Sequence, residues 1–406
     1  MSPDYDIIIA GGGMVGASLA CALREENVRI AVIEPVSPRT SDQPSYDDRG
    51  LALSLASQRI LAGLGLWRNV SGGANPIRHI HVSDRHRFGF VRLDAEMLQI
   101  QALGYVVIAR ELGHVLLDHL AKAKTIDVLC PATVKGVELE SDHAKVNIDV
   151  GSDKKVLTSR LIIIADGTHS DVREMVGIDA QIKDYHQTAI VTNVTPGNDH
   201  NDTAYERFTD SGPMALLPLT GKRCVVVFTV NTQDADHYIN MDDEAFISAL
   251  QVRFGRRLGK FQRIGSRKSY PVIRLEAGDQ VADRAVVLGN SAHTIHPNGA
   301  QGFNLGLRDV AGLAEVLVPA LREGMDVGRQ HLLERYMNLR RRDQRRVIQF
   351  SDGLASLFYN DLPHKVISRN LGMLLIDVIP TLKRSFLRRM TGLHGKQPAL
   401  VRGVSL

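Results

Sequence analysis

The sequence predicts an α/β protein that combines a mostly parallel β-sheet with a second, interleaved β-sheet and a helical C-terminal segment. Three short runs of apolar and β-branched residues, 5–10, 161–165 and 285–289, are typical of strands buried on both faces. Residues 78–93 and 181–270 alternate polar and apolar side chains, which is the period of strands with one face in water. The two patterns therefore predict two different sheets whose strands alternate along the chain.

A glycine-rich turn follows the first strand. Gly11, Gly13 and Gly16 have the G-x-G-x-x-G spacing, and residues 17–24 are good helix formers without proline. In such a strand–turn–helix unit, a Rossmann turn, the glycines allow a tight turn, a close approach to a pyrophosphate, and close packing of helix on strand. Free N–H groups at the start of the helix attract the phosphates. The predicted dinucleotide contacts are Gly11, Gly13, Met14, Val15 and Gly16.

An acidic residue follows the second strand. Residues 29–33 form an apolar run that ends in Glu34, close to the spacing of roughly 20 residues expected for the acid that binds a ribose. A carboxylate accepts hydrogen bonds from ribose hydroxyls and repels a 2′-phosphate, so the site should hold the adenosine of FAD or NAD. An empty Rossmann-like turn is the alternative, and the agreement of strands, glycines, helix and acid disfavours it.

Two arginines near this domain are candidate cofactor contacts. Arg49 lies where a loop enters a helix predicted for residues 51–66. Its guanidinium either pairs with Asp47 or Asp48 at the surface or lies beside a flavin or its phosphates, and the sequence leaves both open. Arg110 begins a further predicted helix that returns the chain to the first domain, and we include it among the predicted contacts.

A third predicted strand, 161–165, ends in Asp166 and Gly167. The carboxyl ends of parallel strands are where α/β proteins bind ligands, so both residues are predicted to contact the cofactor. The alternative is a plain turn before a short helix that is capped by Ser170 or Thr168.

The strand at 285–289 leads into a second glycine-rich segment. Residues 299–302 form a predicted turn that opens a helix over 303–321, and the free N–H groups there make a second anion site. A reduced flavin carries negative charge, which such a helix start would stabilise; the alternative is an ordinary helix start. The predicted contacts are Gly289, Asn290, Pro297, Gly299, Ala300, Gln301, Gly302 and Asn304.

Composition excludes several classes of protein. The chain has 406 residues, 44% hydrophobic and 23% charged, which suits a globular protein of two or three domains. A net charge of +4 is too small to indicate nucleic-acid binding. Three widely spaced cysteines suggest reduced thiols and a cytoplasmic setting. The acidic first residues do not resemble a signal peptide, and no run reaches the roughly 18 apolar residues of a membrane span.

No metal site is expected. His79, His81 and His86 alternate on a predicted strand face without a cysteine or acid to complete a ligand set. His293 and His296 are likewise too weakly supported to be read as metal ligands.

The C-terminal part contains a basic run and an apolar run. Residues 340–346 are arginine-rich on a predicted helix, and such a run is usually a solvated face. Residues 371–382 are apolar but broken by Asp377 and Pro380, and four cations follow, namely Lys383, Arg384, Arg388 and Arg389. This segment either packs on the body, seals an oligomer, or lies on a membrane surface with its cations on lipid phosphates.

Four pieces together resemble a known family, the group A flavoprotein monooxygenases or aromatic hydroxylases. The pieces are the glycine turn with Glu34, Arg49, Asp166-Gly167 with Ser170 and Arg173, and residues 289–306. The form Gly289-Asn290, where the family usually has Gly-Asp, is typical of its ubiquinone-biosynthesis branch. Segments 80–84, 206–209, 212–218 and 302–309 are most similar to 2-octaprenyl-6-methoxyphenol hydroxylases. Residues 298–301 read Asn-Gly-Ala-Gln where that branch usually has x-Ala-Gly-Gln, and we still expect this loop to bind flavin.

The resemblance implies a fold and an activity. FAD is reduced by NADPH or NADH, O₂ adds to give a C4a-hydroperoxyflavin, and oxygen is transferred to the ring of a 2-polyprenyl-6-methoxyphenol. No general base can be named from the sequence. The expected divisions are 1–77, 105–180 and 275–350 for the Rossmann-like FAD-binding domain, 78–104 and 181–274 for the substrate domain, and 351–406 for the helical C-terminal segment.

The resemblance also implies partners. These are the prenylated phenol, and as hypotheses a complex with other proteins of ubiquinone biosynthesis and a peripheral contact with the inner membrane through the C-terminal segment. Three other functions stay open: hydroxylation of another ring position or of a water-soluble aromatic, a flavin-binding but non-catalytic role in a biosynthetic complex, and an FAD-linked reduction of prenyl double bonds.

Overall fold

A parallel sheet forms the base of the molecule. The computed structural model describes residues 3–37, 47–358 and 363–406. Five parallel strands lie in the order β19-β11-β1-β2-β8, and antiparallel β18, β10 and β9 extend this sheet. Its strands are β1 (Tyr5–Ala10), β2 (Ile30–Ile33), β8 (Ile126–Leu129), β9 (Thr133–Leu139), β10 (Ala144–Val150), β11 (Asp153–Ile164), β18 (Val281–Ala282) and β19 (Ala285–Val287).

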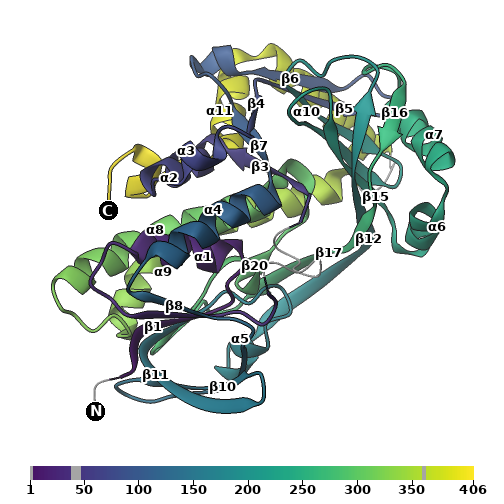
Figure 1. The fold of residues 1–406 in the computed structure, drawn as a ribbon. Coiled ribbons are helices and arrows are strands. Elements are labelled where there is room, and N and C mark those ends of the chain that lie inside the picture. Colours follow the sequence, from purple (N-terminus) through teal and green to yellow (C-terminus); the bar gives the residue numbers. More distant parts are fainter. Residues whose placement is uncertain (1–2, 38–46, 359–362) are drawn as a thin grey trace.

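The strands of the parallel sheet are continuously apolar because other elements pack on both faces of this sheet. Ile7, Ile8 and Ile9 of the central strand are fully buried, and they pair with β2 and β11 on either side. Ile7 and Ile9 pack with helices on one face, whereas Ile8 packs with residues of the antiparallel extension on the other. The helices of the first face, α1, α4, α8 and α9, lie together over the sheet (Figure 1).

The helix after the second glycine-rich segment agrees with its predicted bounds. The prediction of a helix over 303–321 is confirmed by α8, and Ser170 caps the short helix after Asp166 by accepting a hydrogen bond from the Arg173 N–H. The bounds are α1 (Met14–Leu23), α2 (Leu55–Gly63), α3 (Trp67–Val70), α4 (Ala109–Lys122), α5 (Asp171–Met175), α6 (Ala235–Asn240), α7 (Asp243–Phe254), α8 (Gly302–Arg322), α9 (Gln330–Phe358), α10 (Pro363–Val378) and α11 (Pro380–Met390).

The second sheet is built from the alternating segments. Its strand order is β20-β17-β12-β15-β14-β13-β5-β6, with β16 beside β12. Helices α6 and α7 lie against one side of it, and α10 and α11 lie beside β6 (Figure 1). Its strands are β5 (His79–Asp84), β6 (Phe90–Asp94), β12 (Ala180–Pro196), β13 (Thr203–Thr209), β14 (Gly212–Pro218), β15 (Cys224–Asn231), β16 (Phe261–Ile264), β17 (Lys268–Ala277) and β20 (His293–Thr294).

The predicted helix over 51–66 is wrong in its first turn. Residues 50–54 form a strand, β3 (Gly50–Ser54), and the helix α2 begins only at Leu55. The strand is held by β7 (Gly104–Ile108), which also pairs with β4 (Asn75–Ile77) in a three-stranded sheet. A run such as Leu-Ala-Leu suits a strand or a helix, so the partner strand decides, and the Ser54 hydroxyl then caps α2.

The prediction of a solvated face for residues 340–346 is wrong for its first arginine. Arg340 is 1% exposed and donates to the fully buried carboxylate of Asp309 at 2.7 Å. The other arginines of the run are exposed, because positions one, two, five and six residues after Arg340 lie on the solvent side of the helix. They are Arg341, Arg342, Arg345 and Arg346.

No helix in the described ranges is both long and apolar enough to cross a lipid bilayer. The limits assigned to the domains stay a prediction.

Candidate active site

The first glycine turn leaves no room for side chains. A Cβ on Gly11, whose φ is +102°, would lie 2.4 Å from the carbonyl oxygen of Ala165, and a Cβ on Gly16 would lie 2.0 Å from the carbonyl oxygen of Gly11. Close contact between β1, β11 and the start of α1 therefore requires glycine at both positions. Gly13, Met14 and Val15 form the start of α1, and no side chain caps this helix end.

Glu34 lies against the same turn. One oxygen of its carboxylate accepts a hydrogen bond of 2.8 Å from the Gly12 N–H, and the other accepts one of 3.0 Å from the Val36 N–H. The side chain is thereby fixed at the carboxyl ends of β1 and β2, beside the start of α1. Glu34 therefore lies beside the glycine turn, and its contact with a ribose stays a prediction.

The other two predicted segments meet at one serine. Ser291 donates to the Asp166 carboxylate at 3.0 Å and accepts from the Gly167 N–H at 2.9 Å. Burial raises the pKa of the Asp166 carboxyl, although hydrogen bonds from Ser170 and Ser291 act against it. Ser291 thus joins two segments that lie 124 residues apart in the sequence.

Val15 brings the first segment to the third. A Cβ on Gly289 would lie 3.0 Å from a methyl carbon of Val15, and a Cβ on Gly306 would meet the same side chain at 3.0 Å. Asn290 is exposed next to Gly289. The structure therefore collects residues 11–16, 34, 166–167 and 289–290 at one edge of the parallel sheet.

The segment 297–304 forms the entry to α8. Gly299 and Ala300 both have positive φ, +67° and +50°, and Gln301 precedes the helix without a side-chain cap. Asn304 ties this loop to the first segments: its amide oxygen accepts from the Ser54 N–H at 2.7 Å, and its amide nitrogen donates to the carbonyl oxygens of Ala52 and Ala300. The Asn304 amide thus anchors the loop against β3.

The two arginines lie on the side of β3 and α4. Arg49 forms an ion pair of 2.8 Å with Asp47, which is one of the two alternatives considered from the sequence, and its guanidinium lies 4.8 Å from the centre of the Tyr270 ring. Arg110 is exposed and pairs with Asp48. A role of either arginine at a cofactor stays a prediction.

These residues fit FAD. Among the described residues, no side chain caps the start of α1 or of α8, so backbone N–H groups of these helix starts are available to phosphate or to negative charge on a flavin ring. The glycines of the first turn keep the backbone free of side chains where a pyrophosphate would lie. Glu34 supplies a carboxylate at the distance along the chain that a ribose requires.

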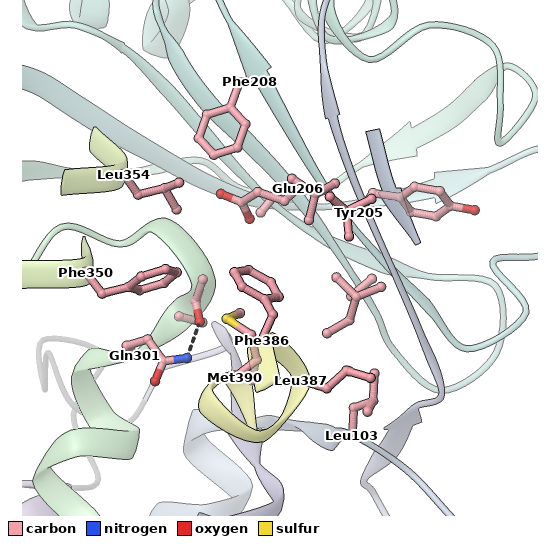
Figure 2. Close-up of a pocket in the computed structure, with 18 of the residues that line it drawn as sticks. Leu103, Tyr205, Glu206, Phe208, Gln301, Phe350, Leu354, Phe386, Leu387 and Met390 are labelled. Carbon is pink, nitrogen blue, oxygen red and sulfur yellow. Dashed lines mark hydrogen bonds between the residues drawn. The ribbon is translucent and has the colours of Figure 1, made fainter. Parts of the chain in front are cut away.

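A large apolar cavity lies beside the 297–304 loop. Its volume is about 540 Å³, within the range of small-molecule sites. Its walls come from β3, β5, β13, β14, α9, α10 and α11, and Pro297, Gly299, Ala300, Gln301 and Asn304 also line it. Figure 2 shows Phe350, Leu354, Phe386, Leu387 and Met390 around the space. Among the described lining residues, only Glu206 and Arg369 carry charge.

Glu206 is a site residue that the sequence reasoning did not single out. It lies on β13 between Ala204 and Phe208, which also line the cavity, so the strand period places all three on one face. Burial raises the pKa of the Glu206 carboxyl to about 7, and the Gly299 N–H acts in the opposite direction. The sequence contains one indication of this role, because Glu206 is an acid in a strand whose side chains alternate between two faces. The sequence alone does not show which of the two faces lines a cavity.

Comparison with known proteins agrees with this geometry. A model of the FAD binding domain family matches residues 4–351. The ubiquinone hydroxylase UbiL of Rhodospirillum rubrum is 37% identical over 99% of this chain and 93% of its own. The 3-demethoxyubiquinol 3-hydroxylase of Escherichia coli is 31% identical over 96% of this chain and 98% of its own.

A solved structure shows the same fold. The p-nitrophenol 4-monooxygenase PnpA of Pseudomonas putida superposes with a TM-score of 0.80 over 98% of this chain and 100% of its own, at 18% identity. The family resemblance and the α/β fold class expected from the sequence are confirmed. The chain therefore belongs to the FAD binding domain family, as an FAD-dependent aromatic-ring hydroxylase of the ubiquinone-biosynthesis group.

Proposed function

We propose that the chain hydroxylates the ring of a polyprenyl phenol, of the 2-polyprenyl-6-methoxyphenol type, in ubiquinone biosynthesis. The observation that carries the proposal is the cavity of about 540 Å³ beside the 297–304 loop, almost wholly apolar and wide enough for a methoxyphenol ring with the first part of a prenyl tail. A water-soluble aromatic acid would need a cation to pair with, and the Arg369 guanidinium of this cavity already pairs with Asp84 at 2.7 Å.

The proposal assigns the predicted cofactor residues to parts of FAD. The start of α1 at Gly11, Gly13, Met14, Val15 and Gly16 holds the pyrophosphate, and Glu34 holds the adenosine ribose. The part of FAD between the pyrophosphate and the flavin ring faces Asp166, Gly167, Gly289 and Asn290. The flavin ring itself faces the loop from Pro297 through Gly302 to Asn304. FAD, once reduced by NADPH or NADH, supplies the activated oxygen from O₂.

The chain's own residues position the ring and exclude water. The Phe350, Phe386 and Leu387 side chains enclose the cavity from α9 and α11, and the Gln301 side chain donates to the Gly299 carbonyl oxygen at 3.1 Å, which braces the loop. An enclosed apolar space protects a reactive oxygen donor from water and holds the ring at one distance from the loop.

A second ring position is a specific alternative. The relative from Escherichia coli is named for hydroxylation at position 3 of a demethoxyubiquinol, and it covers almost the whole of this chain. The same cavity would suit either prenylated ring.

The C-terminal helices support a proposal of membrane contact. Five apolar side chains of α10 are 39–66% exposed, and their spacing puts them on one face of the helix. They are Ile367, Leu371, Leu374, Leu375 and Val378. Met373 and Ile376 of the same helix line the cavity. A prenylated substrate dissolved in a bilayer would then enter under α10. A surface for another protein of ubiquinone biosynthesis is the competing assignment.

The test is a mass-spectrometric profile of quinone intermediates in cells that lack this gene, with and without re-expression. We expect a polyprenyl methoxyphenol to accumulate and to disappear on re-expression. Accumulation of a demethoxyubiquinone would move the assignment to the other ring position, and an unchanged quinone pool would contradict the proposal.

A further inference from the structure

The Glu206 carboxylate is the one acidic group among the described residues of the cavity wall. Figure 2 shows it pointing into the space near Phe350, Leu354 and Phe386, while the Tyr205 ring points away from that space. The carboxylate is therefore displayed to whatever occupies the cavity, inside an otherwise apolar wall.

The protein does not neutralise this carboxylate. The Arg369 guanidinium of the cavity wall donates to Asp84, and the Tyr205 ring packs against the Phe254 ring in a T-shaped pair. In the described part of the chain, no side chain donates a hydrogen bond to Glu206 or forms an ion pair with it. A polar group in an apolar site is costly unless it meets a partner, and here the free side of the carboxylate faces the cavity.

A loop residue that faces Glu206 belongs to the proposed flavin site. The Gly299 N–H faces the Glu206 carboxylate, and Gly299 lies three residues before the start of α8. A ring held by Glu206 would therefore lie against the same loop that we assign to the flavin ring. The sheet places an acceptor for a phenolic hydroxyl where oxygen transfer would occur.

We infer that Glu206 receives the hydroxyl group of the phenol substrate, accepts its hydrogen bond and takes its proton. This inference rests on the proposed function, since it assumes a phenol in the cavity. In the step, the phenolic O–H bond breaks, the proton joins a carboxylate oxygen of Glu206, and the electron pair stays on the phenolic oxygen. The charge spreads to the ortho and para carbons of the ring, which become better nucleophiles toward an electrophilic oxygen.

The raised pKa of Glu206 agrees with this role, because a general base works best when its pKa lies near the working pH. The other ionisable groups of the wall, Arg369 and Tyr205, belong to α10 and to β13 itself. Burial and the Gly299 N–H are the influences on the Glu206 pKa, and no charged side chain is among them.

The experiment compares the FAD-loaded wild type with Glu206→Gln, Glu206→Asp and, as a matched control, the exposed Glu323→Gln. The probe is 2-farnesyl-6-methoxyphenol, with hydroxylated product measured at pH 5.5–8.5. We expect kcat/KM of the wild type to rise through a pKa of about 7. Glu206→Gln should lower kcat roughly 100-fold and lose this rise, with a few-fold change in phenol affinity. Glu206→Asp should keep the rise at a reduced rate.

A second measurement needs no turnover. A prenylated 4-nitrophenol changes colour on ionisation, and its pKa when bound reports the charge beside its oxygen. A carboxylate there disfavours the phenolate, so Glu206→Gln should lower the pKa of the bound probe by about one unit or more, whereas Glu323→Gln should not.

The outcomes separate the two proposals. A Glu206→Gln variant that keeps the rate and pH profile, or leaves the bound probe unchanged, would overturn the role of Glu206. A wild type that hydroxylates no prenylated phenol would overturn the proposed function, and the shift of the bound nitrophenol would then decide whether Glu206 binds phenols.

Discussion

At the scale of single residues, the first glycine turn makes a sharp prediction. Gly16→Ala would gain helix propensity but place its Cβ 2.0 Å from the Gly11 carbonyl oxygen, and the backbone cannot move without opening the turn. We expect FAD affinity to fall at least tenfold and stability to fall by about 1–3 kcal/mol. Flavin absorbance after gel filtration and thermal unfolding measure the two effects.

The control is Gly353→Ala in α9, where a Cβ meets nothing within 4 Å. It should keep FAD and gain up to about 1 kcal/mol, because helix propensity alone acts there. If Gly16→Ala behaved like this control, the close packing at the turn would be irrelevant to cofactor binding.

Glu206 also predicts a pH dependence of stability. Its pKa rises from the usual 4.5 to about 7 in the folded protein, so the folded state binds the proton more tightly than the unfolded state. Stability is then lost as pH rises from about 4.5 to about 7, by up to about 3 kcal/mol. Glu206→Gln should therefore melt higher than wild type at pH 8 and no higher near pH 4.5. Equal differences at both pH values would argue against a Glu206 pKa that is raised by folding.

At the scale of elements, α8 and α9 are joined by buried charges. Burial alone would raise the pKa of the Asp309 carboxyl, but Arg340 and His293 beside it hold that pKa below its usual range. Arg340 also donates to Asp343 at 2.7 Å, and Arg308 donates to the same carboxylate at 2.8 Å. The network fixes α9 on α8, and α9 continues to the cavity wall at Phe350.

Asp309→Asn should therefore destabilise the protein by about 3–5 kcal/mol, because it leaves the buried Arg340 with an incomplete set of partners. Urea unfolding measures this loss. The exposed Asp118→Asn in α4 is the matched control, with an expected change within about 0.5 kcal/mol. A loss for Asp309→Asn no larger than that of the control would refute the network's role.

Elements differ in how far the sequence specified them. The glycine turn, Glu34 and the Ser170 cap were predictable because each has a characteristic residue spacing in the sequence, even though Glu34 bonds to Gly12 across 22 residues. The strand β3 and the burial of Arg340 depend on β7 and on Asp309, which are distant in the sequence. Local sequence patterns do not show which distant residues a segment will contact. For the same reason, the sequence does not show that the Glu206 side chain points into the cavity.

At the scale of the whole molecule, the exposed face of α10 predicts membrane binding. Leu371→Asp with Leu375→Asp should lower flotation of the protein with vesicles of phosphatidylethanolamine and phosphatidylglycerol at least fivefold, because charge is expelled from the apolar interface. Val252→Asp in α7, where the side chain is also exposed but on another helix, is the control. If the double variant floated like wild type, α10 would instead be a surface for a protein partner.

The order of strands in the parallel sheet has a consequence for synthesis in the cell. The sheet joins β1 and β2 near the start of the chain to β19 at residues 285–287, and Asn304 ties the last loop to β3. About three quarters of the chain must therefore be synthesised before all segments of the proposed FAD site can come together. At roughly 5–20 residues per second, the early strands wait many seconds with exposed edges. The exposed strand edges make the incomplete chain prone to aggregation, and the flavin can enter only late.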